Sequence, residues 1–223
     1  MVSIVKRGFV AAGLALWGLS AWGENQAPAP PPAAAEAATQ AQVEATSVIE
    51  RLNRALLEAM RRGKALGYQG RYQLLAPVLQ EIYDFRTISR YVLGSHWKQL
   101  NEAQRQQMID RMTRYGIAAY AAQFDEYNGE TFRIVEEKPF RKRFRLVKAV
   151  LEVPDGDDVE FTYVLRRTKD GWKIIDVRYD GVSDLALKRS QFAKILQEEG
   201  FEALLARLDE KIADYAEEKE AQG

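Results

Sequence analysis

The sequence predicts an α+β protein in which helices cover one antiparallel four-stranded sheet. Three observations lead to this fold class. Apolar residues recur at three- and four-residue steps as far as Phe124, which is typical of amphipathic helices. After Tyr127-Asn128-Gly129 apolar and polar residues alternate, and beyond Gly181 the helical spacing returns. Because helices precede and follow a run of strands joined by short turns, we expect them to pack on that sheet.

The helical segments are expected at about 39–62, 70–83, 87–93, 102–124, 183–198 and 201–217. Proline lacks the N–H that a helix interior uses, so Pro77 should kink or divide the second segment near Ala76. Asn101 and Ser183 stand where side-chain N-caps are expected for the fourth and fifth segments.

The strands are expected at about 131–136, 141–153, 159–168 and 172–179. Turn residues at 153–157 and the tight turn Asp170-Gly171 join the last three, which predicts an antiparallel meander. Phe161 and Tyr163 share the face that helices must cover. Ile174 and Ile175 point to opposite faces, so the last strand should be buried on nearly both sides.

The N-terminus has the features of a cleaved signal peptide. Lys6 and Arg7 precede an apolar run at 8–20 that is too short to span a bilayer comfortably, and Ala21-Trp22-Gly23 offers small residues for cleavage. We therefore expect a signal peptide at 1–23, a Pro/Ala-rich linker at 24–45 that gradually becomes helical, a folded domain at 46–217 and a flexible tail at 218–223. This organisation predicts export to the periplasm.

Composition narrows the function classes. The chain has 32 basic and 32 acidic residues and stays close to neutral without Lys6 and Arg7, which argues against a nucleic-acid binder. It has no cysteine, so disulfides and lipoprotein processing are excluded, and stability must come from packing.

Few residues suggest chemistry. His96 is the single histidine, so a zinc site or a serine-type triad is not expected, and we predict neither a metal nor a cofactor. Asp176 lies in an apolar strand, where a carboxylate is costly unless it is paired. It could act as a general base, or it could form an ion pair or cap with Arg189 or the backbone near Gly181.

A basic run at 138–148 carries six positive charges. On a strand, Arg141, Arg143 and Arg145 would share one face. This face could be a solvated sheet edge protected by its charge, or it could dock on anionic headgroups or an acidic partner.

Three blocks of sequence resemble the toluene-tolerance family, the soluble periplasmic lipid carriers of the Mla lipid-asymmetry system. The first two blocks, in the family's order, are Arg71-Tyr72 to Phe85 and Leu93-Gly94-Ser95-His96-Trp97 to Arg105. The third comprises Gly171, Trp172, Ile174 or Ile175, Asp176 and Val177, followed by Gly181-Val182-Ser183 and Arg189-Ser190-Gln191-Phe192. Residues 66–72 and 124–132 resemble the branch of the family that is associated with hopanoid biosynthesis.

The resemblance implies a deep apolar cavity between helices and sheet that holds lipid tails without catalysis. It also implies a carrier, expected to be a monomer, that serves an inner-membrane ABC transporter complex and an outer-membrane lipoprotein or porin complex. From apolar face and predicted layer we expect the cavity to be lined by Tyr72, Leu75, Val78, Ile82, Met108, Met112, Tyr115, Phe132, Val147, Phe161, Tyr163, Ile175 and Val177. Two alternatives stay open: a lipid-modifying enzyme that uses Asp176 as its base, and an adaptor with a solid core.

Overall fold

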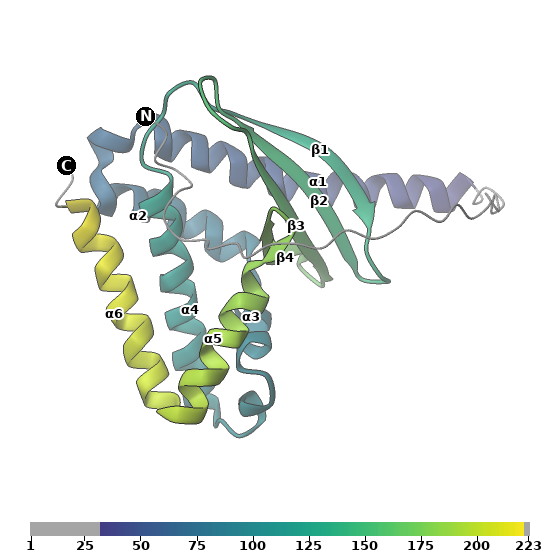
Figure 1. Cartoon of the computed structure of the whole chain (residues 1–223). Coiled ribbons are helices and arrows are strands. Elements are labelled where there is room, and N and C mark those ends of the chain that lie inside the picture. The colour runs from purple at the N-terminus through teal and green to yellow at the C-terminus, as the bar shows by residue number, and fades with distance from the viewer. Residues whose placement is uncertain (1–31, 221–223) are drawn as a thin grey trace, which may run out of the picture.

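The computed structural model is an α+β fold, as the sequence predicted (Figure 1). It describes residues 32–220, with side chains for 45–217. The helices in this part of the chain are α1 (Pro32–Arg61), α2 (Gly63–Ile82), α3 (Phe85–Leu93), the 3-10 turn η1 (Gly94–Lys98), α4 (Glu102–Gln123), α5 (Asp184–Glu198) and α6 (Phe201–Glu220). The strands are β1 (Thr131–Pro139), β2 (Phe144–Glu152), β3 (Val159–Thr168), β4 (Gly171–Tyr179) and β5 (Val182–Ser183).

The strands form one antiparallel sheet in the order β1-β2-β3-β4-β5. The predicted four-stranded sheet is wrong by one strand, because the two-residue β5 folds back on the end of β4 through Asp180-Gly181, both with positive φ. The prediction that strand 141–153 begins at Arg141 is also wrong. Arg141 has φ 64° in the turn before β2, and the strand begins at Phe144.

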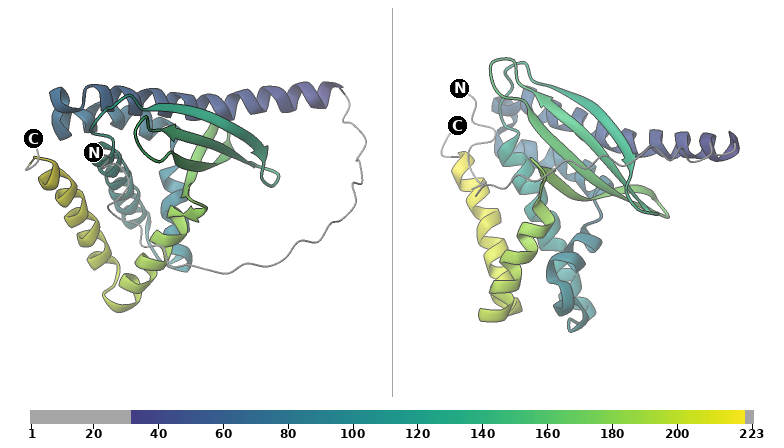
Figure 2. Two further views of the ribbon diagram at one scale, coloured as in Figure 1. Left: turned by 45° about the horizontal axis from the view of Figure 1, so that its top comes forward. Right: turned by 45° about the vertical axis from the view of Figure 1, so that its right-hand side comes forward.

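The helices lie along and below the sheet. α1 runs behind the strands and contacts β1, β2 and β4, while α5 leaves the end of the sheet and α6 returns beside α4 (Figure 2). α4 also packs against α2, and α3 packs against α5. The sheet is therefore covered by helices, and α3 to α6 extend away from it as a second group.

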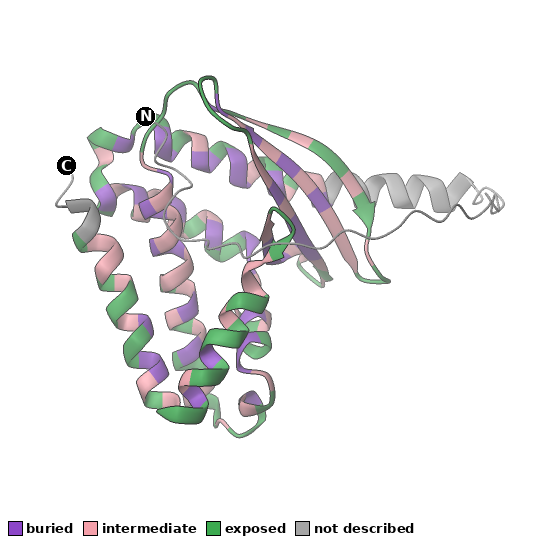
Figure 3. Cartoon of the chain, viewed as in Figure 1, coloured by how far each residue is buried: buried purple, intermediate pink, exposed green. Residues whose placement is uncertain are grey.

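The core lies between these layers, with buried residues following the inner sides of the helices and the middle of β2 to β4 (Figure 3). Val147, Phe161 and Tyr163 are almost fully buried on the covered face of the sheet. Ile174 to Val177 are all buried, as expected for the last strand. The pairing of β3 with β4 shifts at this point, so that Ile175 has no direct partner, as in a β-bulge.

The predicted domain start at residue 46 lies within α1, and the predicted end at residue 217 lies within α6. α1 already begins at Pro32, so the predicted linker is helical from that residue, and α6 continues to Glu220. The predicted signal peptide, the first part of the linker and residues 221–223 lie outside the described residues.

Helix α2 passes through Pro77 with helical dihedral angles, so the predicted division near Ala76 is wrong. Pro77 and Gln73, whose carbonyl loses its partner, are both exposed, so water can satisfy that carbonyl. The interruption lies instead at Gly67, whose φ of 59° leaves the helical range. The two N-caps are confirmed: Asn101 accepts from the N–H of Gln104, and Ser183 accepts from that of Ala186.

Arg71 connects the start of α2 to the C-terminal part of α4. Its side chain is buried, and its Nε and Nη1 donate to the carbonyls of Ala121 in α4 and Gly63 at the start of α2, at 2.8 and 2.9 Å. Gly63 itself lies so close to the chain just after α4 that an added Cβ would be 1.8 Å from the carbonyl oxygen of Asp125. This contact fixes where α2 begins relative to α4.

We expect Arg71→Met to lower the free energy of unfolding by about 2–4 kcal/mol, because two buried carbonyls lose a charged donor. Urea denaturation followed by circular dichroism measures it. Arg54→Met, at an exposed position of α1, is the control and should change stability by less than about 0.5 kcal/mol. Equal stability of the two variants would contradict this role of Arg71.

Candidate functional site

A pocket of about 640 Å³ lies among α4, α5, α6 and strand β4. Met112 and Ala119 of α4, Ile175 and Val177 of β4 and Phe192 of α5 supply apolar walls. This volume falls within the roughly 300–1,000 Å³ of ligand sites in proteins. The arrangement suits an apolar guest held between the second helical group and the end of the sheet.

Five tyrosines also line the pocket, namely Tyr83, Tyr115, Tyr120, Tyr179 and Tyr215. Burial is the main cause that raises the pKa of every one of these hydroxyls above its ordinary value. They therefore stay neutral near pH 7 and can donate hydrogen bonds to a guest.

Charged side chains line the part of the pocket formed by α5 and α6. Lys188 pairs with Asp184 one turn earlier, and its Nζ lies 5.2 Å from the centre of the Tyr115 ring. Arg207 and Lys211 also line the pocket with side chains 57% and 48% exposed, so they mark its solvent-facing edge. The lining thus combines an apolar interior with an edge of charged side chains that form ion pairs.

Asp176 connects the pocket wall to the start of α5. One carboxylate oxygen accepts from the N–H of Leu185 at 3.0 Å, and the other accepts from the hydroxyl of Ser183 at 2.7 Å. The predicted partner Arg189 is wrong, since the cation beside Asp176 is Arg178, at 3.7 Å. A carboxylate at a helix N-terminus satisfies free N–H groups there, so the observed contacts are those of a cap.

The pKa of Asp176 is raised above its ordinary value. Burial is the largest cause, and it outweighs the hydrogen bonds from Ser183 and Leu185 and the nearby Arg178, all of which lower the pKa. A raised pKa favours a proton-accepting role only if a substrate reaches the carboxylate. Here both oxygens already have partners within the protein.

The structure brings four of the thirteen predicted cavity residues to this pocket: Met112, Tyr115, Ile175 and Val177. The other nine are buried or partly buried in the surrounding core, and they are Tyr72, Leu75, Val78, Ile82, Met108, Phe132, Val147, Phe161 and Tyr163. Their contact with a lipid stays a prediction.

A chain of aromatic rings links three of these nine residues to the pocket. Tyr179 in the pocket wall meets Phe161 edge-on, with ring centres 5.0 Å apart. Phe161 in turn lies 6.2 Å from Phe132 and 6.1 Å from Tyr163. These rings stand one layer behind the pocket wall, where they support it.

Sequence reasoning missed the share of the wall that comes from α5 and α6. Leu185, Phe192, Leu204 and Leu208 line the pocket, although their helices were expected only to cover the sheet. The apolar faces of the two helices were visible in the sequence, but a cavity and a packed core have the same pattern.

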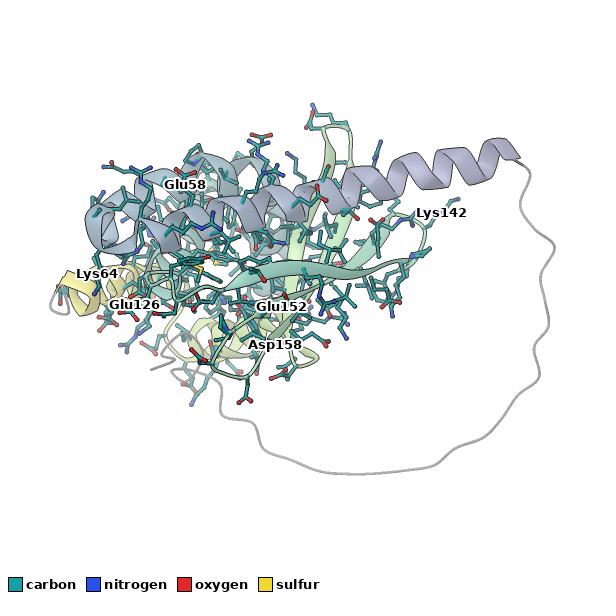
Figure 4. The ribbon with its side chains drawn as sticks, turned by 90° about the horizontal axis from the view of Figure 1, so that it is seen from above. Glu58, Lys64, Glu126, Lys142, Glu152 and Asp158 are labelled. Atoms are coloured by element: carbon teal, nitrogen blue, oxygen red, sulfur yellow. The ribbon has the colours of Figure 1, made fainter. Side chains whose placement is uncertain are left out.

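A second, wider groove of about 1,420 Å³ lies at the opposite end of the sheet from β5 and is lined by basic side chains. Nine basic and four acidic residues line it, and it shares Tyr83 and Phe85 with the apolar pocket. The expected strand face of Arg141, Arg143 and Arg145 is wrong, because only Arg145 belongs to β2. Lys142 lies in the turn before β2, at the end of the molecule away from Lys64 and Glu126 (Figure 4).

The remaining candidates lie apart from these sites. His96 is part of η1 and lines neither the pocket nor the groove. Among the residues that the structure describes, no cluster of three or more metal-binding side chains is present. No helix in the same part of the chain combines the length and apolarity needed to cross a membrane.

A helix-covered antiparallel sheet with an apolar, tyrosine-rich pocket defines a class of α+β proteins with an internal ligand-sized space. Within this class, residues 50–210 match the MlaC protein family, and the chain therefore belongs to that family. This confirms the resemblance seen in the sequence, while the hopanoid-associated branch stays a prediction.

A solved structure shares this fold. It is that of a phospholipid-binding protein from Ralstonia solanacearum in complex with a phospholipid, and it has a TM-score of 0.68 and 21% sequence identity with this chain. The likeness covers 79% of this chain and 98% of the Ralstonia chain. At this identity the likeness establishes the fold.

We expect Asp176→Asn to lower the free energy of unfolding by about 1–2 kcal/mol, because the amide can replace only one of the two accepting oxygens. The deficit should be largest below about pH 4 and smaller at pH 7. A raised pKa means that the unfolded chain releases this proton first, so wild-type stability falls as the pH rises through the folded value.

Urea denaturation of the wild type and of Asp176→Asn at several values from about pH 3 to about pH 8 measures the stability deficit of the variant. Asp170→Asn, in the exposed β3–β4 turn, is the matched control. A deficit that grows toward neutral pH would show that the ionised carboxylate, rather than the neutral acid, is the form that the fold favours.

Proposed function

We propose that this protein is a periplasmic lipid carrier that shuttles phospholipid, or a hopanoid-type lipid, between inner- and outer-membrane complexes without catalysis. The observation that carries the proposal is the apolar pocket bounded by α4, α5, α6 and β4. Membership of the MlaC family and the phospholipid bound by the Ralstonia neighbour support it. The predicted signal peptide supports the location.

The physical need for such a carrier follows from the hydrophobic effect. Exposing a buried methylene to water costs roughly 0.8 kcal/mol, so a tail of about sixteen carbons opposes entry into water by on the order of 10 kcal/mol. A dry pocket removes most of this cost without forming or breaking a covalent bond. The charged edge at Lys188, Arg207 and Lys211 would then lie nearest the polar headgroup.

The two alternatives have less support. The pocket argues against an adaptor with a solid core. An enzyme based on Asp176 would need that carboxylate to exchange its contacts with Ser183 and Leu185 for a substrate. Loss of turnover with retained lipid binding in Asp176→Asn would favour the enzyme.

We expect Ala119→Trp to reduce uptake of a fluorescent phospholipid by about tenfold or more, because the indole fills the pocket from α4. The measurement is uptake by the purified protein from labelled vesicles. Stability should fall by no more than about 1–3 kcal/mol, so the variant should remain folded.

The control for this experiment is Val135→Trp, which adds the same side chain at an exposed position of β1. It should take up lipid as the wild type does. Undiminished uptake by a folded Ala119→Trp protein would show that lipid does not occupy this pocket.

A further inference from the structure

Two tyrosine hydroxyls meet inside the apolar pocket. Tyr83 follows the C-terminal end of α2, Tyr120 belongs to the last turn of α4, and both side chains line the pocket. Their hydroxyl oxygens are hydrogen-bonded to one another, with ring centres 6.1 Å apart. The pair therefore places a polar group beside the apolar side chains of the pocket wall.

Stacking contacts with neighbouring phenylalanines hold the two tyrosine rings in place. Tyr83 stacks on Phe85 with centres 5.4 Å apart, and Tyr120 stacks on Phe124 at 5.6 Å. Gly116 leaves room for this arrangement, since a Cβ there would lie 3.0 Å from the Phe85 ring. Stacking limits the rotation of each ring, so the position of the hydroxyls is set before a ligand arrives.

One hydroxyl proton of the pair is available for a further hydrogen bond. Two hydroxyls carry two protons, and the hydrogen bond between them uses one. Among residues 45–217, neither hydroxyl has a second hydrogen-bond partner. Burial raises the pKa of both, which keeps both protonated. The pair is part-buried in the pocket wall, so an oxygen atom that enters the pocket can accept this proton.

We propose that the Tyr83–Tyr120 pair donates a hydrogen bond to an acyl-ester carbonyl oxygen of the lipid and so selects ester-linked lipids. The inference rests on the proposed function and narrows its cargo to ester-linked phospholipid, because a hopanoid-type lipid lacks the acyl-ester carbonyl. In a diacyl lipid the ester carbonyls are the oxygens next to the tails, so they enter an apolar pocket further than the headgroup does. The oxygen of an ether-linked lipid is a much poorer acceptor, so the pair gains little from it.

The experiment compares a diacyl phosphatidylcholine with its dialkyl ether analogue, which has the same headgroup and chain lengths. The full mature protein is incubated with equal amounts of both in mixed vesicles, and native mass spectrometry gives the ratio of the two complexes. We expect the wild type to prefer the diacyl lipid. The double variant Tyr83→Phe/Tyr120→Phe should lose about 3- to 10-fold of this preference, the effect of one hydrogen bond.

The single variants and a control locate the effect. Tyr83→Phe and Tyr120→Phe each leave one hydroxyl that can still donate, so each should keep part of the preference. Tyr91→Phe removes an exposed hydroxyl of α3 that does not line the pocket and should leave the ratio unchanged. Binding of the ether lipid should be the same in all of these proteins.

Two results would overturn the proposal: a double variant with the wild-type ratio, and a double variant that loses both lipids equally. The first would mean that water, rather than lipid, satisfies the pair. The second would mean that the hydroxyls shape the pocket without selecting ester lipids. Failure of the wild type to bind either lipid would instead overturn the proposed function, so the two failures are distinguishable.

Discussion

The shape of the pocket depends on the place where helix α5 leaves the sheet. Asp176 fixes that place, because its carboxylate holds both the hydroxyl of Ser183 and the N–H of Leu185. The polypeptide turns sharply just before this point, at Asp180-Gly181. With its first turn fixed on β4, α5 forms a wall that faces α4 and α6 while the space between them stays open. These two hydrogen bonds thus fix one wall of the site.

Polar and apolar side chains occupy different parts of the pocket. Aliphatic and aromatic side chains form the interior, and Arg207 and Lys211 stand on α6 toward solvent. The buried tyrosines lie between these extremes, since their rings are apolar and their hydroxyls donate. This gradient from apolar to charged matches the order of groups along a lipid, from its tails through its ester linkages to its headgroup.

Much of the fold could be predicted from the sequence, and less of the site. Periodicity located the helices and the antiparallel sheet, and local side-chain chemistry identified the caps at Asn101 and Ser183. The short β5 and the turn at Arg141 were missed because both depend on positive φ values that residues other than glycine rarely adopt. The residues that line the pocket were harder to predict from the sequence, because Phe161 in the core and Val177 in the pocket wall lie in the same apolar pattern. Only the three-dimensional course of α5 and α6 separates them.

The proposed function requires that a lipid occupy the pocket among α4, α5, α6 and β4. Native mass spectrometry of the wild-type protein, purified from the periplasm without detergent, measures this occupancy. We expect a mass increment equal to one lipid, whose identity is then determined from the extracted fraction. A protein that has only its polypeptide mass, and that gains no lipid mass on incubation with vesicles, would show that the pocket does not hold a lipid.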